Sequence, residues 1–160
     1  MKIDSLAVGS IGTNCYILQD EAAKLCAVID PGDEPERILS AVEQTGCTPT
    51  MILLTHGHFD HYTAVKGLLE KWPELPVYIH ESDVTDKSVG SFSLLFPRLP
   101  EKNQRYYKEG DRLTLGGLTI TVLVFVFLEP FAVLLGAKGV TYQYTIDYLR
   151  GLAPFALCFI

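Results

Sequence analysis

The sequence predicts an α/β domain, and three observations carry this prediction. Short β-rich runs alternate with segments whose apolar residues recur at helical spacing. Turn-forming residues separate these runs over the first 123 residues. The chain has 160 residues, of which 48% are hydrophobic and 20% charged, so it is long and apolar enough to bury one core.

Two β-rich runs and a helix open the pattern. Residues 13–18 (TNCYIL) and 25–30 (LCAVID) predict a hairpin that turns at Asp20 and Glu21. A helix is expected over residues 34–45. Its apolar face is formed by Ile38, Leu39 and Val42.

The ends of this helix carry recognisable signals. Asp33 is expected to be its N-cap, Pro35 lies in the first turn, and Glu36 completes a D-x-x-E capping box. Gly46 is expected to end the helix, because glycine adopts the left-handed conformation of a helix terminus.

The next elements follow in alternation. Residues 51–54 (MILL) predict a buried strand, and the apolar recurrence over 65–72 predicts a helix. Residues 77–80 (VYIH) predict another strand, whereas 84–105 have little regular pattern and predict a long surface connection. Residues 113–123 predict a hairpin around a Gly-Gly turn.

The character of the chain changes near its end, and we divide it at that point. Residues 1–123 form the predicted α/β part, and 124–160 form an apolar tail expected to complete or cap the same domain. The stretch 122–135 is interrupted by Glu129 and is shorter than the roughly 20 residues of a membrane span. A buried strand pair or core helix is expected there, and no membrane partner.

Charge and cysteine usage narrow the class of protein. The formal net charge of −6 argues against a nucleic-acid partner, which would require a basic stripe. No two of the four cysteines form a C-x-x-C motif, so we expect reduced, mostly buried thiols in a cytoplasmic protein. No signal peptide is visible after Met1.

One loop concentrates the residues that can do chemistry. His56, His58 and His61 are three of the four histidines, and Asp60 lies among them. Imidazole and carboxylate are the ligands of catalytic zinc, iron and manganese. The loop follows a predicted strand, which is where α/β proteins place their sites.

The spacing in the loop has a geometric reading. His56 and His58, two apart in extended chain, can face the same side and hold one metal, while Asp60 and His61 can face a second. Two metals about 3.5–4 Å apart share a water and lower its pKa. The competing interpretation is a solvated turn with incidental histidines. The isolated His80 is expected to be a structural or surface residue.

The loop T-H-G-H-F-D-H at 55–61 resembles the H-x-H-x-D-H signature of the metallo-β-lactamase superfamily. The similarity extends over about residues 3–123 and is closest to the hydroxyacylglutathione hydrolase (glyoxalase II) branch. It rests on GTNCYIL (12–18), VIDPGDEPERIL (28–39), ILLTHGHFDH (52–61), VYIHESD (77–83) and EGDRLTLGGLTITVL (109–123).

The resemblance implies a fold, a ligand set and an activity. The fold would be an αββα sandwich, here with a truncated or divergent second half. His56 and His58 would bind the first metal, and Asp60 and His61 the second, with Asp60 also the catalytic candidate. Zinc is the expected metal, with iron or manganese possible. The reaction would be hydrolysis of a small thioester or ester by metal-bound hydroxide.

Asp30 admits two interpretations. By resemblance it supports the loop through hydrogen bonds, as residues behind metal ligands do. Alternatively it is a turn residue that precedes Pro31 and Gly32.

The chain departs from the family pattern after residue 123. No histidine follows His80, so the family's later histidine ligands have no counterpart. Asp147 stands in a setting loosely similar to the family's bridging aspartate and is a candidate metal ligand. The tail is a divergent second half, the product of a frame change or truncation, or part of a degenerate family member.

These departures leave three functions open, and with them whether the protein is an enzyme. The first is a glyoxalase II-like hydrolase. The second is an inactive remnant with a partial metal site. The third is a nuclease of the same superfamily, which the acidic balance disfavours. The sequence leaves the oligomeric state open.

Overall fold

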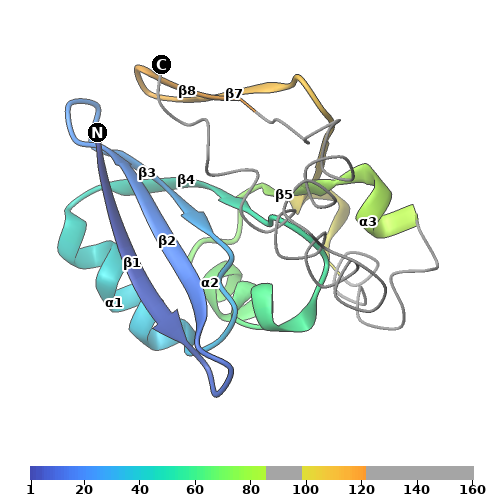
Figure 1. The fold of residues 1–160 in the computed structure, drawn as a ribbon. Helices are drawn as coiled ribbons and strands as arrows, with labels where there is room; N and C mark the ends of the chain where they lie inside the picture. The colour runs from blue at the N-terminus through green and yellow to red at the C-terminus, as the bar shows by residue number, and fades with distance from the viewer. Residues whose placement is uncertain (86–98, 122–160) are drawn as a thin grey trace, which may run out of the picture. The chain divides into compact units, whose positions relative to one another are not determined.

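The computed structural model describes residues 1–85 and 99–121 (Figure 1). The chain divides into two compact units. The first comprises Met1–Tyr107 and Thr114–Leu118, and the second comprises Lys108–Leu113 and Thr119–Ile160. The first unit contains a six-stranded sheet together with all the described candidate site residues. The expectations for the 124–160 tail, including Asp147, lie outside the described residues.

The sheet follows the order of the chain, β1-β2-β3-β4-β5-β6. The first three strands pair antiparallel, whereas β3–β4, β4–β5 and β5–β6 pair parallel. The carboxyl ends of β3 to β6 therefore meet at one edge. The strands are β1 (Lys2–Val8), β2 (Thr13–Asp20), β3 (Leu25–Ile29), β4 (Thr48–Leu53), β5 (Val77–His80) and β6 (Gln104–Tyr107).

Two helices provide the crossovers that parallel pairing requires. Helix α1 (Pro35–Thr45) joins β3 to β4, and α2 (Val65–Lys71) joins β4 to β5 (Figure 1). Both pack on one face of the sheet, because their buried residues share a cluster with alternate residues of β2 to β5. That cluster includes Ile38, Val42, Val65 and Leu68 from the helices and Ile17, Val28, Ile52 and Ile79 from the strands.

The opposite face of the central strands is also covered. Leu18, Ala27 and Met51 occupy intervening positions and are 2%, 0% and 6% exposed. Strands buried on both faces are typical of a sheet inside a layered sandwich. The predicted α/β class is therefore confirmed.

The N-terminus of α1 corrects one prediction. Its N-cap is Glu34, in the left-handed region with φ 54°, and no side chain caps the helix. Asp33 instead accepts a hydrogen bond from the adjacent Glu34 N–H at 2.7 Å, so the capping box does not form. Pro35 begins the helix one residue later than predicted, because its fixed φ suits the first helical position. The expected end is confirmed, with Gly46 at φ 66°.

The predicted connection over 84–105 is wrong in part. Helix α3 (Glu81–Thr85) overlaps its start, and a 3-10 turn η4 (Glu101–Asn103) leads into β6. Strand β6 was not predicted, because its first three residues are polar or exposed, as is usual at the edge of a sheet. Edge strand β1 also gave no predictive pattern.

The remaining element predictions hold within the described residues. Strands appear over 51–53 and 77–80, and residues 112–121 form a hairpin of β7 (Arg112–Leu115) and β8 (Leu118–Thr121). Its turn requires glycine, because Gly116 has φ 59° and an added Cβ would lie 2.4 Å from Asp20 Oδ2. The same carboxylate oxygen accepts the Gly117 N–H at 2.7 Å.

The described cysteines are buried, as expected. Cys15, Cys26 and Cys47 are free and buried, while Cys158 lies outside the described residues. Burial raises the pKa of the Cys15 and Cys26 thiols to about 12, so neither is a reactive thiolate. Within residues 1–85 and 99–121, no helix has the length and apolarity needed to cross a membrane.

Candidate metal centre

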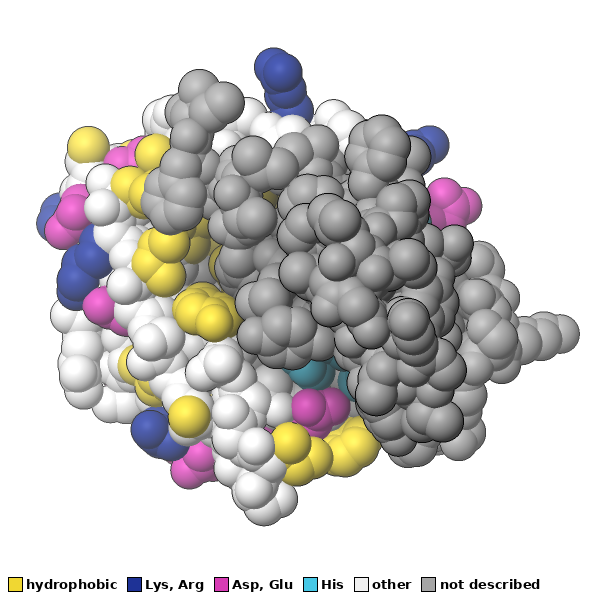
Figure 2. Space-filling view, in the orientation of Figure 1, with side chains coloured by type: hydrophobic (Ala, Val, Ile, Leu, Met, Phe, Trp, Pro, Cys, Tyr) yellow, Lys and Arg dark blue, Asp and Glu magenta, His cyan; other side chains and the backbone are white. Residues whose placement is uncertain are grey.

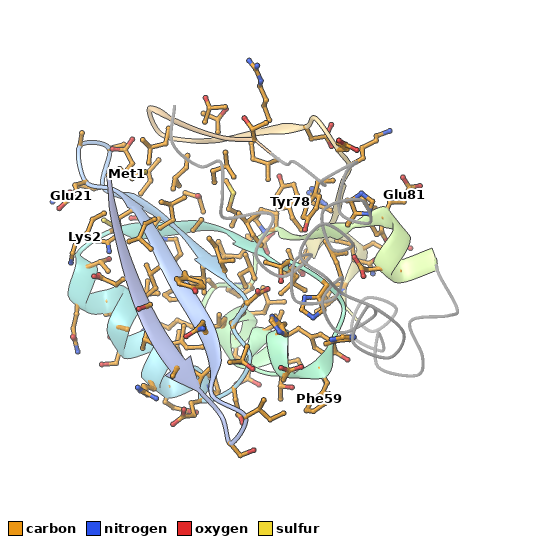
Figure 3. The ribbon with its side chains drawn as sticks, in the orientation of Figure 1. Met1, Lys2, Glu21, Phe59, Tyr78 and Glu81 are labelled. Carbon is orange, nitrogen blue, oxygen red and sulfur yellow. The ribbon has the colours of Figure 1, made fainter. Side chains whose placement is uncertain are left out.

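The histidine-rich segment emerges from β4 at the carboxyl edge of the parallel strands. We call residues 55–61 the histidine loop. It ends in a 3-10 turn, η1 (Phe59–His61), and leads into α2. Phe59 projects from it and is 48% exposed (Figure 3). Figure 2 shows histidine atoms beside carboxylate atoms on this face of the molecule.

The three imidazoles of the histidine loop are in mutual contact. His56 Nε2 lies 2.9 Å from His58 Nδ1, and the ring centroids of this pair are 4.4 Å apart. The centroids of His56 and His61 are 4.0 Å apart. The prediction that His56 and His58 face the same side is confirmed, and His61 joins them.

Asp60 is held beside these rings by the first residue of β2. Its Oδ2 accepts a hydrogen bond from Thr13 Oγ1 at 2.8 Å and lies 3.5 Å from His61 Nε2. Gly32 approaches its backbone so closely that an added Cβ would lie 1.8 Å from the Asp60 carbonyl oxygen. Only glycine permits this approach, which sets the position of Asp60.

Asp30 supports the histidine loop from the end of β3. It is 2% exposed and accepts hydrogen bonds from the Thr55 amide at 2.8 Å and the Thr55 hydroxyl at 2.6 Å. Its Oδ2 also lies 2.9 Å from His61 Nδ1, although no partner of Nδ1 meets the directional requirement of a hydrogen bond. Of the two interpretations of Asp30, the loop-supporting one is confirmed.

The pKa values of His56 and His61, at the two ends of the histidine loop, are shifted in opposite directions. Burial, followed by the proximity of His61 and His58, lowers the pKa of His56 to about 3, against the opposing effect of Asp60. Burial acts in the same direction on His61, but Asp30 and then Asp60 outweigh it and raise the His61 pKa above its ordinary value. His56 is therefore neutral, which is the form of histidine that binds metals. At His61, a metal would compete with a proton for the ring nitrogen.

The donor chemistry of the histidine loop fits a divalent metal, but the arrangement is incomplete. Three imidazoles and one carboxylate are gathered, yet His56 and His58 direct nitrogens at each other. In the described part of the chain, no three His, Cys, Asp or Glu side chains are arranged to hold a metal ion. A metal at His56 and His58 would have to replace their mutual hydrogen bond and draw on further ligands.

A hollow of about 50 Å³ lies beside Asp60. Two exposed apolar side chains border it: Ile11, 64% exposed in the β1–β2 turn, and Phe59. The hollow is lined by Val8, Gly9, Ser10, Ile11, Thr13, Gly32, Asp33, Phe59, Asp60 and Thr63. Polar and apolar groups therefore meet next to the histidine loop.

The sequence motif indicates the donors but not the residues that orient them. His56, His58, Asp60 and His61 come together as expected, and His80 lies half-buried at the end of β5 with its ring 5.8 Å from that of Tyr107. Thr13 and Gly32 were not identified as site residues. Their only signal was their place in the quoted motifs, 12–18 and 28–39.

A partly parallel sheet with an H-x-H-x-D-H loop at its carboxyl edge, between a strand and a helix, defines the metallo-β-lactamase type of domain. The family model of the metallo-beta-lactamase superfamily matches residues 8–126. The chain therefore belongs to this superfamily.

Two curated relatives show how far the similarity extends. The chain is 37% identical over 115 residues to the probable metallo-hydrolase YqgX of Bacillus subtilis, covering 69% of this chain and 53% of that protein. It is 32% identical over 137 residues to the hydroxyacylglutathione hydrolase GloC of Haemophilus influenzae, covering 77% of this chain and 60% of that protein. The chain thus spans less than two thirds of either relative.

Solved structures agree on the fold. TTHA1623 in a di-iron-bound form is 36% identical with a TM-score of 0.55, over 69% of this chain and 56% of that one. The B3 metallo-beta-lactamase BLEG-1 is 29% identical with a TM-score of 0.58, over 75% of this chain and 59% of that one. The predicted sandwich family is confirmed.

Proposed function

We propose that this chain carries part of a metal-dependent hydrolase site that acts on a small thioester, as in glyoxalase II. The gathering of three imidazoles and Asp60 at the carboxyl edge of the sheet carries the proposal. The 32% identity to a hydroxyacylglutathione hydrolase supports the thioester as substrate class.

Each residue of the site has a proposed role. His56 and His58 hold one metal, and Asp60 and His61 hold a second, with Thr13 and Asp30 orienting the ligands through their hydrogen bonds. Zinc is the expected metal, and the di-iron form of a 36% identical protein supports iron as an alternative. A bound divalent metal supplies a water of lowered pKa and polarises the carbonyl oxygen.

The hollow beside Asp60 suits a small substrate. Its volume of about 50 Å³ suits a small group, such as the acyl end of a thioester. The exposed Ile11 and Phe59 offer apolar contact beside the polar Thr13 and Asp60. A small organic substrate fits this chemistry better than an extended nucleic acid, which the net charge of −6 also disfavours.

A second candidate function is an inactive remnant with a partial metal site. The histidine loop offers two donors for each of two metals, and the described residues contain no group of three suited to one ion. Catalytic zinc sites normally have three protein ligands. No histidine follows His80 in this sequence, and Asp147 is the candidate for a further ligand.

We expect the purified chain to bind at most about one transition metal, and weakly. Two donors per metal leave each site short of the three ligands of a stable catalytic centre. Elemental analysis after exhaustive dialysis measures the metal content. Two tightly held metals per chain would contradict the expectation and would require ligands beyond the described residues.

We expect thioester hydrolysis far below that of a complete superfamily member. The assay uses an acylated thiol with added zinc, iron or manganese. Loss of a residue that is hydrogen-bonded to a metal ligand typically costs roughly 10–100-fold in activity. His58→Ala removes a proposed ligand itself, so it should lower any metal-dependent turnover by more than that. His80→Ala, which removes an imidazole outside the histidine loop, is the matched control.

The outcomes of this assay separate the two candidate functions. Turnover that His58→Ala abolishes and His80→Ala preserves would support the hydrolase and reject the remnant. No metal-stimulated turnover in the parent protein would favour the remnant. Equal turnover in the parent and His58→Ala would indicate an activity that does not use the histidine loop.

A further inference from the structure

Tyr107 is a buried residue that the proposed function leaves without a role. It is the last residue of β6 and is only 6% exposed. Its hydroxyl donates a hydrogen bond to the Leu54 carbonyl oxygen at 2.5 Å, across 53 positions of the sequence. Leu54 is 0% exposed and immediately precedes the histidine loop.

The Leu54 carbonyl and the Thr55 amide belong to the same peptide unit. Tyr107 binds one side of that unit through the carbonyl, and Asp30 binds the other through the Thr55 N–H at 2.8 Å. Because a peptide unit is planar and rigid, two such contacts fix its orientation. The unit is therefore held between the ends of β3 and β6.

The neighbouring contacts extend this restraint in both directions. On one side, the Leu54 N–H donates to the Tyr78 carbonyl of β5 at 2.8 Å (Tyr78 is labelled in Figure 3). On the other, Thr55 Oγ1 binds Asp30 and lies 3.0 Å from His56 Nδ1. The orientation of the Leu54–Thr55 peptide thereby sets the position of His56, the first histidine of the histidine loop.

We propose that Tyr107 is a positioning residue of the metal site, whose hydroxyl clamps the Leu54–Thr55 peptide and so aligns the histidine loop for metal binding. The metal-binding part of this inference rests on the proposed function. The clamp itself does not depend on the proposed function, because the hydrogen bond of Tyr107 should restrain the histidine loop in the metal-free protein as well.

Tyr107→Phe isolates the hydroxyl, because it keeps the ring and removes one oxygen. Two controls accompany it. Tyr106→Phe removes the hydroxyl of the adjacent, 49% exposed ring, which donates a hydrogen bond to Gln104 Oε1 and does not contact the Leu54–Thr55 peptide by a hydrogen bond. Asn103→Ala removes a buried amide that donates to the Pro73 and Leu75 carbonyls at 2.9 and 2.8 Å, in the 3-10 turn just before β6.

The first measurement is amide hydrogen exchange in the metal-free proteins. In Tyr107→Phe, exchange at Thr55 and His61 should accelerate at least about tenfold, the factor expected from loss of one buried hydrogen bond. Tyr106→Phe should leave these rates unchanged. Asn103→Ala should destabilise the fold without accelerating these amides beyond its effect on the amides of β2 and β3.

The second measurement is metal affinity, read from the absorption spectrum of added Co²⁺ under conditions where each variant is folded. Tyr107→Phe should weaken metal binding by about 10–100-fold, which is the usual effect of losing a residue that orients metal ligands through hydrogen bonds. Both controls should bind the metal as tightly as the parent. If Tyr107→Phe does not fold, the ¹³Cζ resonance of Tyr107 in the parent protein serves instead. It should move on addition of diamagnetic Zn²⁺, while that of Tyr106 should not.

The outcomes distinguish this inference from the function on which it partly rests. Unchanged exchange at Thr55 in Tyr107→Phe, or equal acceleration by Asn103→Ala, would overturn the clamp. Equal metal affinity in the parent and Tyr107→Phe would overturn its role in the metal site. A static Tyr107 resonance on metal addition would overturn it as well. No metal binding by the parent, with faster loop exchange in Tyr107→Phe, would overturn the proposed function and support the clamp.

Discussion

Gly32→Ala is expected to displace the histidine loop and to lower the free energy of unfolding by about 1–3 kcal/mol, the usual cost of overpacking, or more. The added methyl carbon would lie 1.8 Å from the Asp60 carbonyl oxygen, a distance that no non-bonded carbon–oxygen pair adopts. The clash involves backbone, so no side-chain rotation relieves it. Chemical denaturation measures the loss of stability, and Co²⁺ binding measures the displacement of Asp60.

Gly117→Ala is the matched control for this substitution. Its added Cβ would lie 3.6 Å from Asp20 Oδ2, an ordinary contact distance, and it lies outside the histidine loop. We expect it to change stability by less than Gly32→Ala and to leave metal binding unchanged. Wild-type stability and metal affinity in Gly32→Ala would show that the close approach to Asp60 does not hold the histidine loop.

Asp30→Ala is expected to lower the free energy of unfolding by roughly 3 kcal/mol or more, because it removes a buried carboxylate from several partners at once. The Thr55 amide and hydroxyl would lose their acceptor, and His61 would lose the nearer of its two carboxylates. Chemical denaturation of the metal-free protein measures this effect. A loss below about 1 kcal/mol would contradict the supporting role of Asp30.

Asp30→Asn separates charge from shape. Asparagine tolerates the left-handed backbone that Asp30 adopts, with φ 49°, and retains an oxygen for the Thr55 amide. It removes the main influence that raises the pKa of His61, so this pKa should fall. A titration of the His61 ring resonances in the metal-free protein measures the change, and an unchanged pKa would contradict the assignment.

The same variant has a defined dependence of stability on pH. A raised pKa in the folded state means that protonated His61 stabilises the fold below the unfolded value of about 6.5. This contribution is lost as the pH rises through the folded pKa. The stability difference between the parent and Asp30→Asn should therefore be largest below about pH 6.5 and shrink above the folded pKa.

The elements that sequence reasoning located are those with strong local patterns. Residues 51–54 form a continuous apolar run, and the helix that ends at Gly46 has both an apolar stripe and a glycine terminus. Strands β1 and β6 lack such patterns, because they lie at the two edges of the sheet formed by the described residues, where polar side chains are tolerated. The cap of α1 was placed one residue early, because the position of Pro35 outweighed the D-x-x-E spacing.

The sequence by itself determined that a strand delivers His56, His58, Asp60 and His61 into one short loop, because residues so close along the chain cannot separate. Only the tertiary structure decided how that loop is held. Thr13 meets Asp60 across 47 positions, and Tyr107 meets Leu54 across 53. Such contacts depend on strand order and register, which bring the ends of β3 to β6 to a common edge. No local sequence pattern predicts that these strand ends lie together, because their arrangement depends on how the whole sheet buries its apolar faces.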